Sequence, residues 1–130
     1  MTKTLTLEGA RIRDIPSFYA EVNRVFMAGE DWTLGESLDA FEDLLHGGYG
    51  AIAGRELVRL VWKDLEVSRS ALGAEATAAH LRAKLQRPDL YNVARIHRQL
   101  DAVERGDGPT YFDTILHILA DHPNIELVAA

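Results

Sequence analysis

Three short β-type runs, separated by long helical stretches, constrain the fold of this chain more than any other feature. Leu5 and Leu7 alternate with threonines within residues 4–8, a pattern that is typical of a strand. Further strands are predicted at residues 57–62 and 125–128. Strands with helices between them cannot pair as tight hairpins, so they pair in parallel through crossover connections. We therefore predict an α/β fold with a small three-stranded parallel sheet and helices packed against it.

Six helices are predicted from apolar residues at spacings of three and four, and from the Gly and Pro residues that interrupt them. Pro16 suits a first helical turn, and Pro88 ends an Ala-rich helix. The predicted helices are one of about a dozen residues starting near residue 15, then residues 37–46, 64–72, 74–86, 90–104 and 110–120. The resulting order is β-α-α-β-α-α-α-α-β.

The size and composition of the chain indicate one globular domain. Its 130 residues are 47% hydrophobic and 26% charged, which is ordinary for such a domain. It has no apolar run of about 18 residues, no apolar signal core near the N-terminus and no Cys. We therefore predict a single domain over residues 1–130, located in the cytoplasm, with no membrane partner and no thiol chemistry.

The negative charge of the chain is concentrated in one segment. The net charge is −6. Residues 30–54 contain no Lys or Arg and carry six acidic residues, which are Glu30, Asp31, Glu36, Asp39, Glu42 and Asp43. A surface that binds nucleic acid directly needs the opposite sign, because phosphate contacts are made by Lys and Arg. The predicted partner is therefore a basic protein.

The centre of this acidic segment, GESLDAFEDLLHG at residues 35–47, is predicted to be an amphipathic helix that starts near Ser37. Its apolar side consists of Leu38, Phe41, Leu44 and Leu45. Glu36, Asp39 and Asp43 fall on about the opposite side. Asp39 and Asp43 lie one turn apart, and such a like-charge pair costs an isolated helix a few tenths of a kcal/mol. A fold that keeps the pair can use it to bind a positively charged surface.

This segment resembles the second helix of the barstar family, small intracellular inhibitors of microbial ribonucleases whose pattern here is roughly G-E-N-L-D-A-L-x-D-x-L-x-G. Ser37 and Phe41 depart from that pattern. The resemblance continues through TLTLEG, DIPSFYAEVNRVF, LVRLVWKDLEVSRSALG and PTYFDTILHILADHPNIELV. It implies the barstar fold, a three-stranded parallel sheet with helices packed against it. Residues 75–107 are then a helical insertion, which either thickens the helical layer or adds contacts to a partner or a second copy of the chain.

The resemblance also implies a function, namely inhibition of a basic ribonuclease or related toxin by covering its active site, with no reaction and no cofactor. Matched by position, Asp39 and Asp43 correspond to the two Asp residues with which the family contacts the enzyme. The other predicted contact residues are Glu36, Glu42, Trp32, Thr33, Leu34, Gly35, His46 and Gly47. For Trp32, the residue type favours a position over the core, with an exposed anchor as the alternative.

The chain also departs from the family at the site. Glu42 stands where the family usually has a large aromatic residue, and the aromatic pair of the preceding loop falls at Thr33 and Leu34. These departures leave open a regulatory or scaffold module that keeps the fold without binding a ribonuclease. They also leave open the simplest interpretation, a solvated acidic helix face. The oligomeric state is not determined by the sequence.

Two further functions find little support in the sequence. Asp43 and His46 lie one turn apart, and Asp113, His117 and Asp121 form a second row at a spacing of four. Neither row is completed by a second metal-binding motif, so no metal site is predicted. The paired acids could act in general acid–base catalysis. However, they lie on a predicted exposed face and the chain has no nucleophile motif, so we predict no enzyme.

Overall fold

The computed structural model describes residues 2–130; Met1, which belongs to the predicted domain, lies outside the described residues. The strands and α-helices follow one another in the predicted order, with one additional 3₁₀ helix, η1. The elements are β1 Lys3–Glu8, η1 Gly9–Arg11, α1 Ile15–Phe26, α2 Leu38–Leu45, β2 Val58–Lys63, α3 Leu65–Ala71, α4 Ala74–Leu85, α5 Val93–Glu104, α6 Tyr111–Ala120 and β3 Ile125–Ala129.

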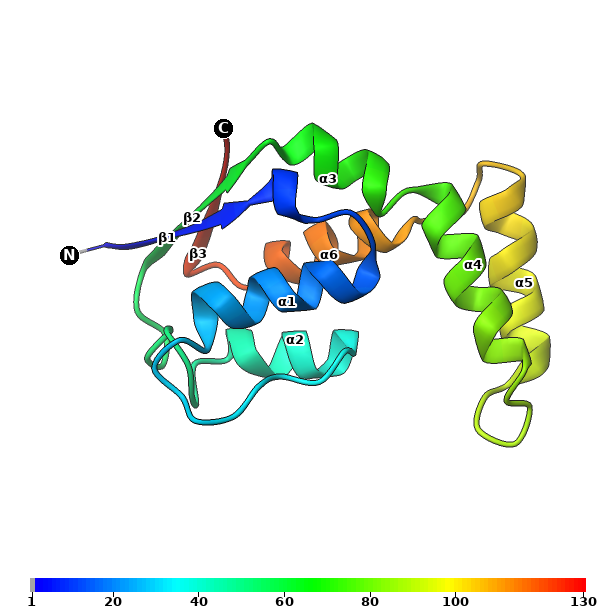
Figure 1. Ribbon diagram of the computed structural model, residues 1–130, viewed down its shortest axis with the longest axis horizontal. Coiled ribbons are helices and arrows are strands. Elements are labelled where there is room, and N and C mark those ends of the chain that lie inside the picture. The colour runs from blue at the N-terminus through cyan, green and yellow to red at the C-terminus, as the bar shows by residue number, and fades with distance from the viewer. Residues whose placement is uncertain (1) are drawn as a thin grey trace.

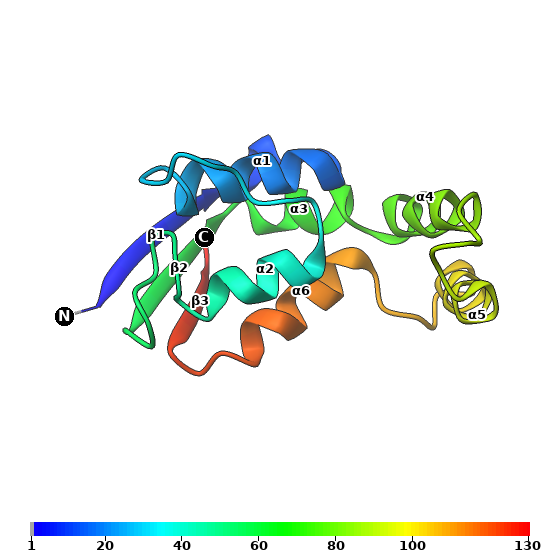
Figure 2. The ribbon, with the colours of Figure 1, turned by 90° about the horizontal axis from the view of Figure 1, so that it is seen from below.

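The three strands form one parallel sheet, as predicted, and the structure shows that their order in the sheet is β1-β2-β3 (Figure 1). Along β2, buried Val58, Leu60 and Trp62 alternate with more exposed neighbours such as Arg59 and Lys63. One face of the sheet therefore packs against the helices, whereas the other face is turned toward solvent. Figures 1 and 2 show the same two-layer arrangement, with α1, α2 and α6 gathered on one side of the strands.

Aromatic side chains join the helices to the sheet. Trp62 on β2 is fully buried, and its ring stacks on Phe18 of α1 with centroids 6.2 Å apart. Phe41 of α2 contacts Phe18 edge-on at 5.4 Å, and Phe112 of α6 contacts Trp62 at 5.5 Å. The indole Nε1 of Trp62 donates a hydrogen bond to Ser68 Oγ at 2.9 Å, so its polar atom is satisfied within the core. This cluster fixes α2 against the body of the protein.

Helices α4 and α5 form a hairpin that projects from one end of the body (Figures 1 and 2). The hairpin has an apolar cluster separate from the main core, made of Ala78, Leu81, Ile96, Leu100 and Val103 with Leu85 packed against it. The interpretation that residues 75–107 thicken the helical layer is therefore wrong, because the two helices bury their apolar sides against each other. The second helix of the hairpin, α5, begins at Val93 and not at the predicted Leu90. The Asn92 side chain caps it by accepting a hydrogen bond from the Arg95 amide at 3.1 Å.

Candidate functional site

Helix α2 has the orientation predicted from its pattern. The Ser37 side chain caps it by accepting a hydrogen bond from the Ala40 amide at 3.0 Å. Phe41, Leu44 and Leu45 are each at most 1% exposed and belong to the main core. The buried apolar side leaves the opposite side of the helix at the surface.

That surface side carries three carboxylates that form no ion pair among residues 2–130. Glu36, Asp39 and Asp43 are exposed. Among residues 2–130, none of the three carboxylates lies within 4.0 Å of a basic side chain. Their charge is therefore available to a partner. Burial, and to a lesser degree the negative charge of Asp43, raise the pKa of Tyr49.

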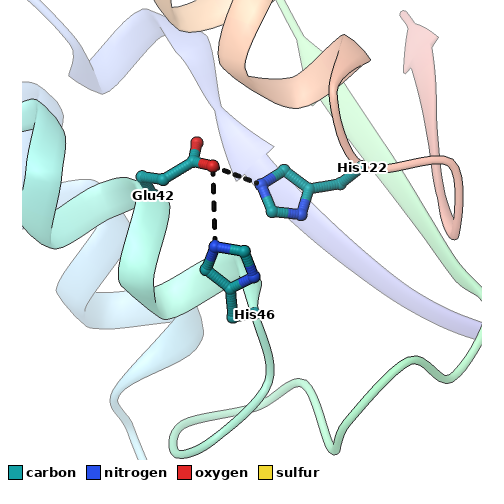
Figure 3. Close-up of side chains that lie close together, drawn as sticks. All are labelled: Glu42, His46 and His122. Carbon is teal, nitrogen blue, oxygen red and sulfur yellow. Dashed lines mark ion pairs between the residues drawn. The ribbon is translucent and has the colours of Figure 1, made fainter.

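Glu42 has a different environment from these three acids. It is partly buried, and its Oε1 lies 3.6 Å from His46 Nε2 and 3.2 Å from His122 Nε2 (Figure 3). His122 comes from the turn between α6 and β3. Glu42 thus interacts within the chain, and its predicted contribution to partner binding stays a prediction.

The loop before α2 differs from expectation at two neighbouring residues. Trp32 is 44% exposed and packs against the Tyr49 ring at 4.9 Å, so the favoured position over the core is wrong; its role as an anchor for a partner stays a prediction. Leu34 is 5% exposed and belongs to the core. Its prediction as a residue that contacts a partner is therefore wrong for its side chain, which is buried within the protein. The Asn23 side chain holds Leu34 in place, since Oδ1 accepts from the Leu34 amide at 2.6 Å and Nδ2 donates to the Leu34 carbonyl at 3.3 Å.

The predicted contact residues that remain at the surface flank α2 on both ends. Thr33 and Gly35 are exposed before the helix, and the His46 side chain is 64% exposed after it. Gly47 follows His46 with φ +82°, and a Cβ there would lie 2.1 Å from the Gly54 carbonyl oxygen. Gly47 therefore has a structural role in closing the turn after α2. Tyr49 joins this surface through Trp32; it was missed because an isolated Tyr in a Gly-rich loop has no periodic signal.

The α4–α5 hairpin faces the N-terminal end of α2 across an open groove of about 620 Å³. Glu36 and Asp39 lie on one side of this groove, and Lys84, Tyr91 and Arg95 on the hairpin lie on the other. The segment predicted as an insertion is thus next to the predicted contact residues. Sequence reasoning could not place it there, because nothing in the pattern of α4 or α5 relates them to residues 36–39.

Of the two metal-binding rows considered in the sequence, neither is assembled among residues 2–130. In α6, Asp113 instead accepts a hydrogen bond from the Thr110 amide at 3.0 Å as part of a helix cap. Within the same residues, the group of side chains that could hold an ion is Glu42, His46 and His122. His122 was missed because it lies far from α2 in the sequence.

The three-stranded parallel sheet is covered on one face by helices, and one of these, α2, has exposed acidic side chains. These features define a small α/β protein of barstar architecture. The chain belongs to the barstar family: the family described as Barstar (barnase inhibitor) matches residues 2–87, more than half of the chain. Proteins of this family are inhibitors and not enzymes. No curated protein matches the chain.

The family match bears on the hairpin as well. It extends through α4 and ends at residue 87, inside the segment predicted as an insertion. The boundaries of that insertion, at residues 75 and 107, therefore stay a prediction.

Among residues 2–130, no helix is both long and apolar enough to cross a membrane.

Proposed function

We propose that this chain inhibits a basic ribonuclease of the barnase type, or a related toxin, by covering its active site with α2 and the loop before it. Family membership supports the class of function. The observation that carries the proposal for this chain is a set of exposed carboxylates that form no ion pair among residues 2–130, namely Glu36, Asp39 and Asp43. The proposed place of action is the cytoplasm, and no cofactor takes part.

The chemistry of the proposed complex follows from what each side presents. A ribonuclease active site holds Arg, Lys and His side chains that bind phosphate groups. Carboxylates at Asp39 and Asp43 can occupy those phosphate positions and accept paired hydrogen bonds from Arg. Complementary charge also speeds the encounter of the two proteins. The exposed ring of Trp32, held against Tyr49, supplies an apolar anchor beside the charges.

The decisive experiment is a calorimetric titration of a barnase-type ribonuclease with the wild type and with Asp43→Ala, together with an assay of RNA cleavage. We expect Asp43→Ala to weaken binding by about 2 kcal/mol or more, about thirtyfold in Kd, and to leave the fold intact. The weight placed on Asp43 comes from its match to the family and not from its geometry. Glu66→Ala is the matched control, since it removes the same charge from α3, where the side chain is 78% exposed.

The outcomes separate the site from the function. Tight binding that Asp43→Ala leaves unchanged would remove Asp43 from the site while keeping the inhibitor. If the wild type fails to bind or inhibit the ribonuclease, a regulatory or scaffold module becomes the better assignment. A pull-down from the native host lysate, with the wild type beside an Asp39→Lys/Asp43→Lys variant, then identifies a different basic partner.

A further inference from the structure

Three side chains with metal-binding atoms converge between α2 and the turn after α6 (Figure 3). Glu42 and His46 lie one turn apart at the C-terminal end of α2, and His122 approaches from the turn that leads into β3. Their ligand atoms, one carboxylate oxygen and two imidazole nitrogens, all lie within 4.8 Å of one another. Segments distant in the sequence thus bring a compact donor set together.

His122 gives this cluster a feature that an ordinary surface ion pair lacks. Its side chain is 8% exposed, and its Nε2 has no hydrogen-bond partner within residues 2–130, although Glu42 Oε1 is 3.2 Å away. The Glu42 oxygen is close but is not aligned as an acceptor for Nε2. A buried nitrogen without a partner is unfavourable, and such atoms in native proteins usually have a ligand or a role. Figure 3 shows this nitrogen on the side of the His122 ring that lies toward Glu42 and His46.

The donor set matches the chemistry of zinc. Two imidazoles and one carboxylate are a known set of three protein ligands for Zn²⁺, with the fourth position left for water or another group. Zinc-to-ligand distances of about 2.0–2.2 Å place neighbouring ligand atoms of a tetrahedron about 3.3–3.6 Å apart. The observed separations from Glu42 Oε1, 3.2 Å to His122 and 3.6 Å to His46, are close to that spacing. His46 is 64% exposed at the end of its helix, so its ring is free to rotate onto an ion.

We propose that Glu42, His46 and His122 bind a divalent transition-metal ion of the zinc class, through the Glu42 carboxylate and the Nε2 atoms of both histidines. The bound ion links the C-terminal end of α2 to the turn between α6 and β3. It leaves one coordination position for water or for a side chain of another molecule. This site stands on its own geometry and does not depend on inhibition of a ribonuclease.

The test uses the full, tag-free chain, from which metals are first removed with a chelator. Zn²⁺ is then titrated into the protein, and the heat of binding is measured by calorimetry. We expect one ion per chain, a thermal midpoint that rises with zinc concentration, and, with Co²⁺ in place of zinc, the visible absorption of a tetrahedral site. His46→Ala should weaken binding at least about tenfold, since loss of even an outer partner of a metal ligand costs that much. His46 is exposed, so this variant keeps the fold.

His97→Ala is the matched control, because His97 is an exposed histidine on α5, outside the cluster. It should bind zinc as the wild type does. His122→Gln provides a second test from the buried side, with its fold checked by circular dichroism. The proposal is overturned if the wild type shows neither heat nor a cobalt spectrum, or if His46→Ala binds zinc as tightly as the wild type and His97→Ala.

Discussion

Glu21 is a charged residue inside the core, and its hydrogen bonds explain how the fold tolerates it. It lies on α1 and is 3% exposed. Oε2 accepts from the Glu8 amide at 2.7 Å and from Arg24 Nη2 at 2.6 Å, and Oε1 accepts from Arg24 Nε at 2.8 Å. Burial acts to raise the pKa of Glu21, but the Arg24 guanidinium and the Glu8 amide outweigh it and hold the pKa below the ordinary value of 4.5. The ionised carboxylate therefore ties α1 to the end of β1.

We predict that Glu21→Gln lowers the free energy of unfolding by about 1–3 kcal/mol at neutral pH, because the amide cannot accept all three hydrogen bonds. A carboxyl whose pKa is lowered by folding stabilises the protein above its unfolded pKa, and this contribution is lost as the pH falls through the folded pKa. Urea denaturation at several pH values should thus show the difference from wild type shrinking below pH 4.5. Glu66→Gln is the control, since Glu66 and Arg69 form the same (i, i+3) pair at the surface. A difference that grows in acid would contradict this account.

Gly47 and Gly48 are neighbours with opposite tolerance for a side chain. Gly47 has φ +82° and no room for a Cβ, whereas a Cβ on Gly48 would meet nothing within 4 Å. We predict that Gly47→Ala lowers the free energy of unfolding by about 1–3 kcal/mol, and that Gly48→Ala changes it by about 0.5 kcal/mol or less. Thermal denaturation by circular dichroism measures both. Equal effects of the two substitutions would show that the turn adapts and that Gly47 is not structural.

At the scale of elements, helix α2 was predictable and the loop before it was not. Apolar spacing determines which side of a helix faces the core, so Phe41 and Leu44 were placed correctly, as were exposed Asp39 and Asp43. The loop before α2 has no periodic spacing of apolar residues. There, hydrogen bonds from the Asn23 side chain decide that Leu34 turns inward. Such a contact between distant residues leaves no local pattern to read.

The hairpin shows a different limit of sequence reasoning. The apolar stripes of α4 and α5 predict helices that pack on something, but they do not distinguish the sheet from a neighbouring helix. In the structure, α4 and α5 pack against each other and not against the sheet. Because its apolar cluster is separate, we expect the hairpin to open independently of the main core.

We therefore predict that Ile96→Ala destabilises only the hairpin, whereas Ile115→Ala destabilises the whole protein. Ile96 belongs to the hairpin cluster and Ile115 to the main core. Each truncation should cost about 2–5 kcal/mol locally. Hydrogen exchange should show faster exchange confined to α4 and α5 for Ile96→Ala, and faster exchange throughout, β2 included, for Ile115→Ala. Uniform acceleration by Ile96→Ala would mean that the hairpin and the body unfold as one unit.

At the scale of the whole molecule, the sequence predicted the distribution of charge and the succession of strands and helices along the chain, but not the approach of distant side chains. The acidic segment from residue 30 to residue 54 could be counted directly. The approach of His122 to α2, and of the hairpin to Glu36 and Asp39, depends on how α6 and α4 pack. These two features of the candidate site, which the sequence did not predict, are contacts between segments far apart in the chain.

The charge distribution predicts a strong effect of salt on the association of the proposed complex. We expect the association rate with a basic ribonuclease to fall by about tenfold or more between about 0.01 and 1 M salt, as the Debye length falls from about 30 to 3 Å. The dissociation rate should change much less. Rapid-mixing kinetics measure both rates. An association rate that is independent of salt would indicate a mainly apolar interface and would weaken the role assigned to the acidic face.

The two tryptophans of this chain lie in opposite environments. Trp62 is fully buried against Phe18, and Trp32 is 44% exposed beside Tyr49 in the loop that precedes α2. Their intrinsic fluorescence therefore reports on two different events. Emission from Trp62 follows the integrity of the core, whereas emission from Trp32 responds to whatever covers the acidic face. The protein thus carries an unlabelled optical signal for folding and a second one for encounter with a partner.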